Sequence, residues 1–193
     1  MERQPVYRKW TFEEYLAYEE ETGIKHEYID GEIYAMTGGT KKHSVMATNC
    51  TTEIGVQLRD SDCYVASSDM RVQISPTKFV YPDFLVVCGQ DEFMDDKEVT
   101  LLNPTLVAEV ISDSSEKYDK GLKSEYYRSI ESLQHYLIVD QNRVYVQLYT
   151  RGNDGKWIFQ EFKQRDTMIP LEAIGVELPV DEVYRGFIFD NPL

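Results

Sequence analysis

The sequence predicts one α/β domain with a mixed central β-sheet flanked by helices, preceded by an N-terminal helix and a hairpin. Apolar residues recur every four positions through 41–58, which is typical of an amphipathic helix packed on a sheet. The stretch 105–111 is almost continuously apolar, as expected of a strand buried on both faces. The chain has 193 residues, a usual length for one domain, so we expect residues 1–193 to form a single domain.

The N-terminal part contains two local signals. Thr11 and Glu14 have the spacing of a capping box, which predicts a helix over about 11–20. The segment 27–36 has two extended halves separated by an Asp-Gly dipeptide, which is typical of tight hairpin turns. We therefore expect a helix followed by a hairpin, ahead of the long helix.

Most of the other elements are expected to be strands. Two extended runs, 69–74 and 79–88, are separated by a turn-like Ser-Pro-Thr-Lys segment, and we expect them to pair antiparallel. The near-continuous apolar strand follows and should be central in the sheet. Three later strands that form a meander are predicted at 135–140, 143–149 and 157–162.

A second helix is predicted over 119–130. Its apolar face is expected to consist of Leu122, Tyr126 and Ile130, which recur every four residues. Lys123 lies on the adjoining row, from which its long side chain can reach the rim of the sheet. The alternative is an ordinary surface lysine surrounded by solvent.

Charge and cysteine content limit the function classes. Twenty Lys and Arg against 34 Asp and Glu give a net charge of −14, so any site for a polyanion must be local or assisted by a metal. Apolar runs are too short for a membrane helix, and the N-terminus does not resemble a signal peptide.

The cysteines Cys50, Cys63 and Cys88 are odd in number and lack CxxC spacing, so we expect no disulfide framework or zinc site, and a cytoplasmic location.

Two carboxylates fall inside apolar strands, where a charge is costly. Asp83 interrupts the run 80–87, and Glu109 interrupts the strand 106–111. Each needs a hydrogen-bonding partner, a cation or a proton, and two together favour a hard divalent ion such as Mg²⁺. The alternative for each acid is a residue at a strand end that pairs with Arg or caps a loop. Pro82 cannot donate to a ladder and marks a bulge or edge beside Asp83.

Four segments carry a resemblance to a known family. They are Tyr81-Pro82-Asp83, 108–112 (AEVIS), 118–123 (YDKGLK) and Tyr127-Arg128. In this order they resemble a restriction-endonuclease-like family of bacterial proteins in the PD-(D/E)xK nuclease superfamily. The resemblance covers nearly the whole chain, from residue 11 to residue 179, and none of the motifs is specific by itself.

The resemblance implies an endonuclease that hydrolyses DNA phosphodiester bonds with Mg²⁺, for which Mn²⁺ can substitute. Asp83 and Glu109 would bind the metal, with Glu27 as a further ligand or as an ordinary exposed strand residue. In the superfamily's simple pattern a lysine stands two residues after the second acid, where this sequence has Ile111. The resemblance therefore implies that Lys123, on the following helix, supplies the catalytic cation.

The remaining expectations concern partners. The resemblance implies DNA as the substrate, and a homodimer is expected because cleavage of both strands of a duplex needs two sites. A non-catalytic nuclease-fold module that binds or regulates is the alternative function, which the negative charge and Ile111 favour. His43, at the start of the long helix, is expected either to cap the surface or to contact a phosphate.

Overall fold

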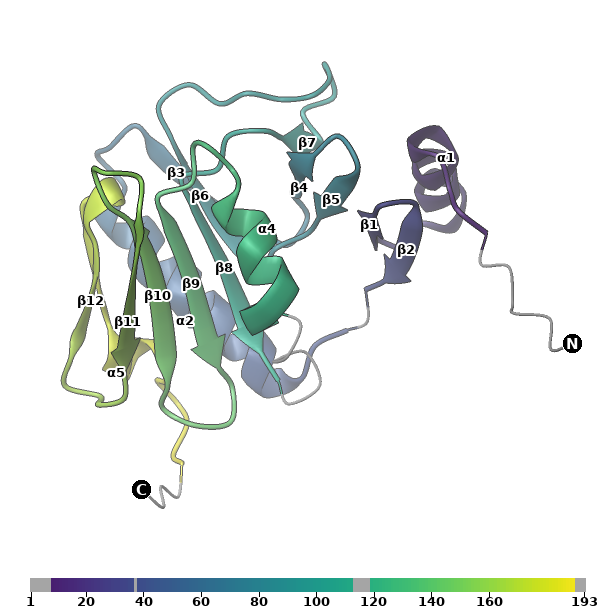
Figure 1. Cartoon of the computed structure of the whole chain (residues 1–193). Helices are drawn as coiled ribbons and strands as arrows, with labels where there is room; N and C mark the ends of the chain where they lie inside the picture. Colours follow the sequence, from purple (N-terminus) through teal and green to yellow (C-terminus); the bar gives the residue numbers. More distant parts are fainter. Residues whose placement is uncertain (1–7, 37, 113–118, 190–193) are drawn as a thin grey trace, which may run out of the picture.

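Two large β-sheets, a two-stranded sheet and the helices around them form the part of the chain that the computed structural model describes, residues 8–36, 38–112 and 119–189. The larger sheet is mixed and lies between helices, and a smaller sheet lies beside it toward the N-terminus (Figure 1). The predicted α/β class, with its N-terminal helix and hairpin, is confirmed. None of the described helices combines the length and the apolar character that crossing a membrane requires.

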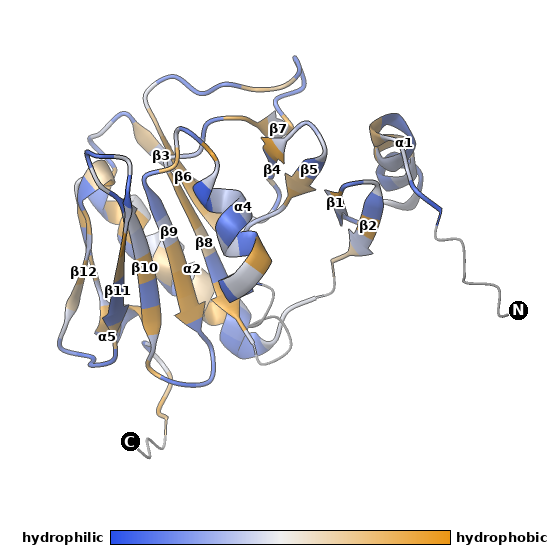
Figure 2. Ribbon diagram, viewed as in Figure 1, coloured by the Kyte–Doolittle hydropathy of each residue, from blue (hydrophilic) through white to orange (hydrophobic). Residues whose placement is uncertain are grey.

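The six-stranded sheet contains the central strand that the sequence predicts. Strand β8 pairs in parallel with β9 and antiparallel with β6, which makes the sheet mixed. Strands β6 and β9 are largely hydrophobic along their length (Figure 2). The strands, in their order across the sheet, are β11 (Trp157–Phe162), β10 (Val146–Arg151), β9 (His135–Asp140), β8 (Leu106–Ile111), β6 (Phe84–Cys88) and β3 (Cys63–Ser67).

Helices cover both faces of this sheet. Helix α2 (Lys41–Gln57) buries Met46, Cys50 and Ile54 against one face, as its four-residue spacing predicts. The other face is covered by a π-helical turn η1 (Asp119–Lys123) that continues into α4 (Ser124–Arg128). Because side chains alternate along a strand, β8 contributes residues to both cores.

The smaller sheet carries the N-terminal elements. The capping box of Thr11 and Glu14 is present and starts α1 (Phe12–Thr22). In the hairpin, both Asp30 (φ 51°) and Gly31 (φ 89°) have positive φ, as a tight two-residue turn requires. The five strands, in their order across the sheet, are β2 (Glu32–Ala35), β1 (His26–Ile29), β5 (Lys78–Val80), β4 (Arg71–Ser75) and β7 (Thr100–Leu101).

The extended run 79–88 is not one strand, and this corrects the prediction of a single antiparallel pair. Residues before Pro82 form β5, which pairs with β4 in the smaller sheet, whereas residues after Asp83 form β6 in the larger sheet. Pro82 has no N–H for a ladder hydrogen bond, so the chain can change sheets there. Asp83 consequently lies where the two sheets meet.

The helix predicted over 119–130 is shorter in the structure than expected, and it turns a different row of side chains toward the sheet. It ends at Arg128, and Gly121 interrupts it with a non-helical backbone. Leu122, expected to face the core, is 54% exposed, whereas Lys123 and Tyr127 are buried. The inward row is polar because both buried side chains bind the carboxylate of Glu109.

The expectation of no disulfide is wrong. Cys63 on β3 lies directly opposite Cys88 on β6, with Cα atoms 4.0 Å apart, and the two form a disulfide. The pairing of two strands brings these residues together across 25 positions, which local spacing does not reveal. Cys50 is a buried free thiol, and the cytoplasmic location remains a prediction.

The C-terminal part packs over one end of the larger sheet and is tied to it by His135. It consists of strands β12 (Met168–Leu171) and β13 (Val176–Pro179), a 3₁₀ turn η2 (Glu172–Ile174) and the short helix α5 (Val180–Val183). The N–H of Ala173 donates to His135 Nε2 at 3.0 Å. Nδ1 must then carry the imidazole proton, which it donates to Thr150 Oγ1 at 3.1 Å.

His135 makes the stability of the fold pH-dependent. Burial lowers its pKa from 6.5 to about 4, because the ring loses water and Nε2 already faces an N–H donor. Between pH 6.5 and about 4, His135 is therefore protonated in the unfolded chain and neutral in the folded chain. We expect this contribution to be present above pH 6.5 and to decrease as the pH falls toward about 4, by about 3 kcal/mol in total.

His135→Gln isolates this contribution from the carboxylates that titrate in the same range. Urea unfolding at pH 7 and near pH 4 should show the wild type losing about 3 kcal/mol more than the variant between the two pH values. A difference in unfolding free energy between the two proteins that is independent of pH would contradict this role of His135.

Candidate active site

A polar cavity of about 230 Å³ lies where the two sheets meet. The junction of the sheets, strand β8, the first turn of α2, the β1–β2 hairpin and η1 all contribute to its wall. It brings together the candidate residues that the sequence predicts, although they lie far apart along the chain. The lining residues are Glu27, Tyr34, Ala35, Met36, His43, Tyr81, Asp83, Glu109, Val110, Asp119 and Lys123.

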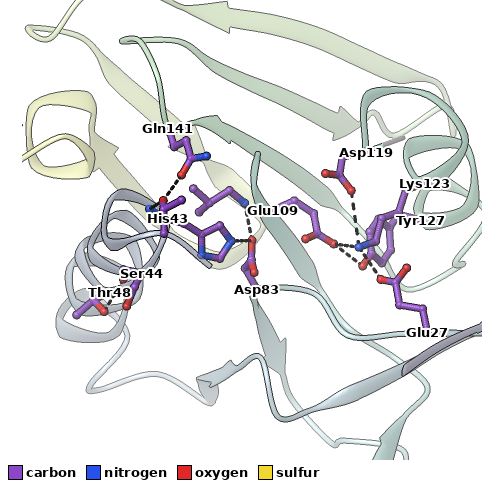
Figure 3. Close-up of polar contacts among 12 residues, drawn as sticks. Glu27, His43, Ser44, Thr48, Asp83, Glu109, Asp119, Lys123, Tyr127 and Gln141 are labelled. Carbon is purple, nitrogen blue, oxygen red and sulfur yellow. Dashed lines mark hydrogen bonds and ion pairs between the residues drawn. The ribbon is translucent and has the colours of Figure 1, made fainter. Parts of the chain in front are cut away.

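Asp83 is fixed at the junction by two donors. Its Oδ2 accepts the N–H of Val110 at 2.7 Å and the imidazole Nε2 of His43 at 2.9 Å (Figure 3). Phe84 is paired with Ala108 on β8, so Asp83 stands one step further toward the position of Glu109. Both hydrogen bonds use Oδ2, so Oδ1 is the oxygen that a metal could use among the described contacts of Asp83.

His43 holds Asp83 from the first turn of α2. Thr40 caps this helix by accepting the N–H of His43 at 3.1 Å, and it donates to Gln141 at 2.6 Å. The hydrogen bond to Asp83 raises the pKa of His43, because the carboxylate stabilises the imidazolium. The sequence suggested a surface cap or a phosphate contact for His43; the structure instead places it on Asp83, 40 residues away, and no local spacing signals this contact.

Lys123 lies between the carboxylates of two different elements. Its Nζ is 2.8 Å from Glu27 Oε1 on β1 and 2.8 Å from Glu109 Oε1 on β8, and 3.7 Å from Asp119 Oδ1 (Figure 3). Lys123 and Glu109 are each only 5% exposed. The alternative of a solvated surface lysine is therefore wrong, and so is that of an exposed Glu27, which is 8% exposed.

The electrostatics of the cluster reflect an excess of carboxylates. Burial raises the pKa of Glu109 well above its usual range, and the neighbouring charges of Asp83 and Asp119 raise it further against the opposing effect of Lys123. Burial acts to lower the pKa of Lys123, but Glu109, Glu27 and Asp119 outweigh it and hold that pKa well above its usual value. The ammonium is consequently charged, and the site still lacks positive charge.

Two residues explain why the lysine comes from the helix. Ile111, at the position where the simple superfamily pattern has lysine, is 1% exposed and packs in the apolar core with Tyr127 and Tyr136. The helix that covers this face of β8 carries Lys123 one turn before Tyr127, whose hydroxyl donates to Glu109 at 2.8 Å. Tyr127 is a site residue that the sequence did not single out for a role.

The predicted set of three metal ligands is not assembled. Within the described ranges, no three His, Cys, Asp or Glu side chains are grouped so that they could hold one ion, and the Lys123 ammonium lies between Glu27 and Glu109. Asp83 and Glu109 nevertheless line one cavity, and each uses a single oxygen for its hydrogen bonds. Two hard oxygen donors in an electron-rich site fit Mg²⁺, which keeps several waters and takes few protein ligands.

A mixed sheet with one acid on its central strand, a second acid just before the adjacent strand and a lysine brought to them by a covering helix defines a restriction-endonuclease-like domain. Residues 12–181 match the model of the Uma2 family, described as "Putative restriction endonuclease". The chain belongs to this family, as the ordered motifs of the sequence implied.

Two relatives and one solved structure are also similar to this chain. The uncharacterized protein slr1290 of Synechocystis sp. is 39% identical over 184 residues, 95% of each chain. The uncharacterized protein sll1609 of the same organism is 34% identical over 152 residues, 78% of this chain and 86% of that one. The crystal structure of "a putative nuclease belonging to DUF820" from Anabaena variabilis has the same fold, with a TM-score of 0.69, 16% identity and coverage of 84% of this chain and 90% of that one.

The contact between His43 and Asp83 can be tested without altering either residue. A Cβ at position 39 would lie 2.7 Å from His43 Nδ1, whereas one at position 38 would meet nothing within 4 Å, and neither glycine has a positive φ. We expect Gly39→Ala to displace the imidazole and to bring the raised pKa of His43 back toward 6.5. NMR titration of the histidine ring protons in metal-free protein measures this.

Asp83→Asn and Gly38→Ala are the controls. The first removes the charge that raises the pKa of His43 and should lower it, and the second should leave it unchanged. Equal effects of the two glycine substitutions would show that the ring is not held in this geometry.

Proposed function

We propose that this protein is a Mg²⁺-dependent endonuclease that hydrolyses phosphodiester bonds of DNA. The observation that carries the proposal is the 2.8 Å contact of the buried Lys123 ammonium with Glu109, in the cavity that also holds Asp83. Two carboxylates and a lysine in one recessed site are the groups that phosphoryl chemistry needs for charge stabilisation. The family description supports the same reaction class.

Each residue has a stated role in this proposal. Asp83 and Glu109 hold Mg²⁺, or Mn²⁺ in its place, and the ion when bound supplies Lewis-acid polarisation of the phosphate and of water. Lys123 hydrogen-bonds the attacking water or the charged phosphate oxygens as the water oxygen adds to phosphorus and the bond to the leaving sugar oxygen breaks. Glu27 touches Lys123, so we assign it to positioning the ammonium.

DNA binding, dimerisation and location belong to the same proposal. A net charge of −14 opposes long-range attraction of DNA, so binding must depend on local contacts and the metal. A homodimer in the cytoplasm remains our expectation. The alternative, a nuclease-fold module without activity, retains the support of the acidic charge and of the apolar Ile111.

Lys123→Met tests the role of the ammonium. If its charge stabilises the attacking water or the developing phosphate charge, we expect cleavage to fall by about 10²-fold or more while Mn²⁺ still binds. Lys123→Arg should restore activity only in part, because a planar guanidinium does not reproduce a compact ammonium. Cleavage of supercoiled plasmid and of branched DNA with Mg²⁺ or Mn²⁺ is the measurement, with circular dichroism as the check on folding.

Asp83→Ala supplies the background rate for this comparison. If Lys123→Met cleaves like the wild type while Asp83→Ala is inactive, the nuclease stands and the role of Lys123 is wrong. If the wild type and Asp83→Ala are equally inert on every substrate, the non-catalytic module is the better account.

A further inference from the structure

An apolar pocket of about 460 Å³ adjoins the candidate active site. Its volume is within the range of small-ligand sites, about 300–1,000 Å³. Its wall consists of Ile29, Leu122, Tyr126, Glu27 and Tyr34, and the last two residues also line the polar cavity. The two hollows therefore lie side by side and share part of their wall.

The β1–β2 hairpin and the η1–α4 segment contribute to both hollows. On the hairpin, Tyr34 is the cross-strand partner of Glu27, and Ile29 follows Glu27 on the same face of β1. On the helix, Leu122 and Tyr126 are one turn apart and form the row beside Lys123. A ligand that contacts Glu27 and Lys123 is therefore next to the apolar pocket.

Two of the large side chains in the wall of the pocket are exposed. Leu122 is 54% exposed and Tyr34 is 50% exposed. The Lys78 ammonium lies 5.2 Å from the ring centroid of Tyr126, so the aromatic wall also has a cation at its edge. Aromatic and aliphatic faces with a neighbouring cation are the lining that a flat heteroaromatic ring prefers.

Cations beside the pocket are already occupied by protein carboxylates. Lys78 is 2.8 Å from Asp30, and Lys123 is 2.8 Å from both Glu27 and Glu109. These two ammonium groups are therefore partly neutralised before they can contact DNA phosphates, the contacts that supply most of the affinity for a duplex. Glu109 is also recessed, at 5% exposure, so a strand must bend toward it. The adjoining apolar pocket offers a further source of binding energy beside the phosphate contacts.

We infer that the pocket binds an unpaired nucleobase next to the scissile phosphate, so the substrates are DNAs with a single-stranded segment. Bases in a duplex are stacked and present only their edges, whereas an unpaired base can place its face on Tyr126, Tyr34 and Leu122. This inference rests on the proposed function, because it takes the strand in the pocket to be the one that reaches Asp83 and Glu109. It adds the substrate class to that function.

The test measures binding, so it does not depend on catalysis. Fluorescence anisotropy compares a single strand of about ten thymidine nucleotides with a strand of equal length in which abasic residues replace every nucleotide, and both carry the same phosphates. Ca²⁺ replaces Mg²⁺, and a gel confirms that the strand stays intact. For the wild type, we expect the abasic strand to bind about tenfold more weakly.

Tyr126 variants then complete a double-mutant cycle, in which the two changes are the substitution of Tyr126 and the removal of the bases from the strand. Tyr126→Ala should weaken binding of the thymidine strand by about tenfold, and removing the bases should cost this variant only about twofold. Tyr126→Phe keeps the ring and should bind within about twofold of the wild type. Phe159→Ala removes a 45% exposed aromatic side chain from β11, at the far edge of the larger sheet, and should bind like the wild type.

Several results would overturn the inference. It is wrong if base removal weakens the wild type and Tyr126→Ala equally, or if Tyr126→Ala changes only the oligomeric state in gel filtration, which would mean that the pocket binds a protein surface. If Tyr126→Ala does not fold, Leu122→Ala takes its place in the cycle.

The failure of this inference is distinguishable from the failure of the proposed function. Suppose that the wild type cleaves duplex as well as single strands, that Asp83→Ala is inactive and that the cycle shows no coupling. The proposed nuclease function then holds, and the role of the pocket is wrong. If the cycle shows coupling but no substrate is cleaved, the pocket binds a base and the proposed nuclease function is wrong.

Discussion

The buried Lys123 ammonium, held between Glu27 and Glu109, is the interaction on which the rest of the site depends. It joins the hairpin, the central strand and the covering helix, three elements that otherwise belong to different layers. Removal of one partner from a buried ion pair typically costs about 3–5 kcal/mol, because the remaining charge is left uncompensated. The same contact turns the helix so that a polar row faces inward and Leu122 faces outward, which opens the apolar pocket beside the active-site cavity.

The charge of the cluster gives the site its chemical character. Four carboxylates line the cavity, and the buried one on β8 has a pKa raised by burial and by its acidic neighbours. A single ammonium and a histidine do not balance this charge, and the Mg²⁺ ion that we propose would supply a further cation here. Asp83 is already oriented by the Val110 N–H and by His43, and its position therefore does not depend on that cation. The proposed Mg²⁺ ion and the Lys123 ammonium would both compensate the negative charge of the same carboxylates.

Much of the fold could be predicted because its signals are local: the capping box at Thr11, the hairpin turn and the four-residue spacing of the long helix all depend on adjacent residues. The two acids stood out because a carboxylate inside an apolar strand is costly. The facing of Lys123 was missed, since apolar periodicity assigns the inward row to Leu122 and takes no account of a buried partner such as Glu109. The contact of His43 with Asp83 depends on how α2 packs against the junction of the sheets, and that of Cys63 with Cys88 depends on the pairing of β3 with β6; sequence spacing encodes neither.

A crystal structure with Mn²⁺ tests the central claim most directly, because anomalous scattering locates the ion without reference to activity. The account predicts one ion in the cavity with an oxygen of Asp83 and an oxygen of Glu109 each about 2 Å away, and with Lys123 still hydrogen-bonded to Glu109. An empty cavity at saturating Mn²⁺, or an ion bound without either carboxylate, would contradict it.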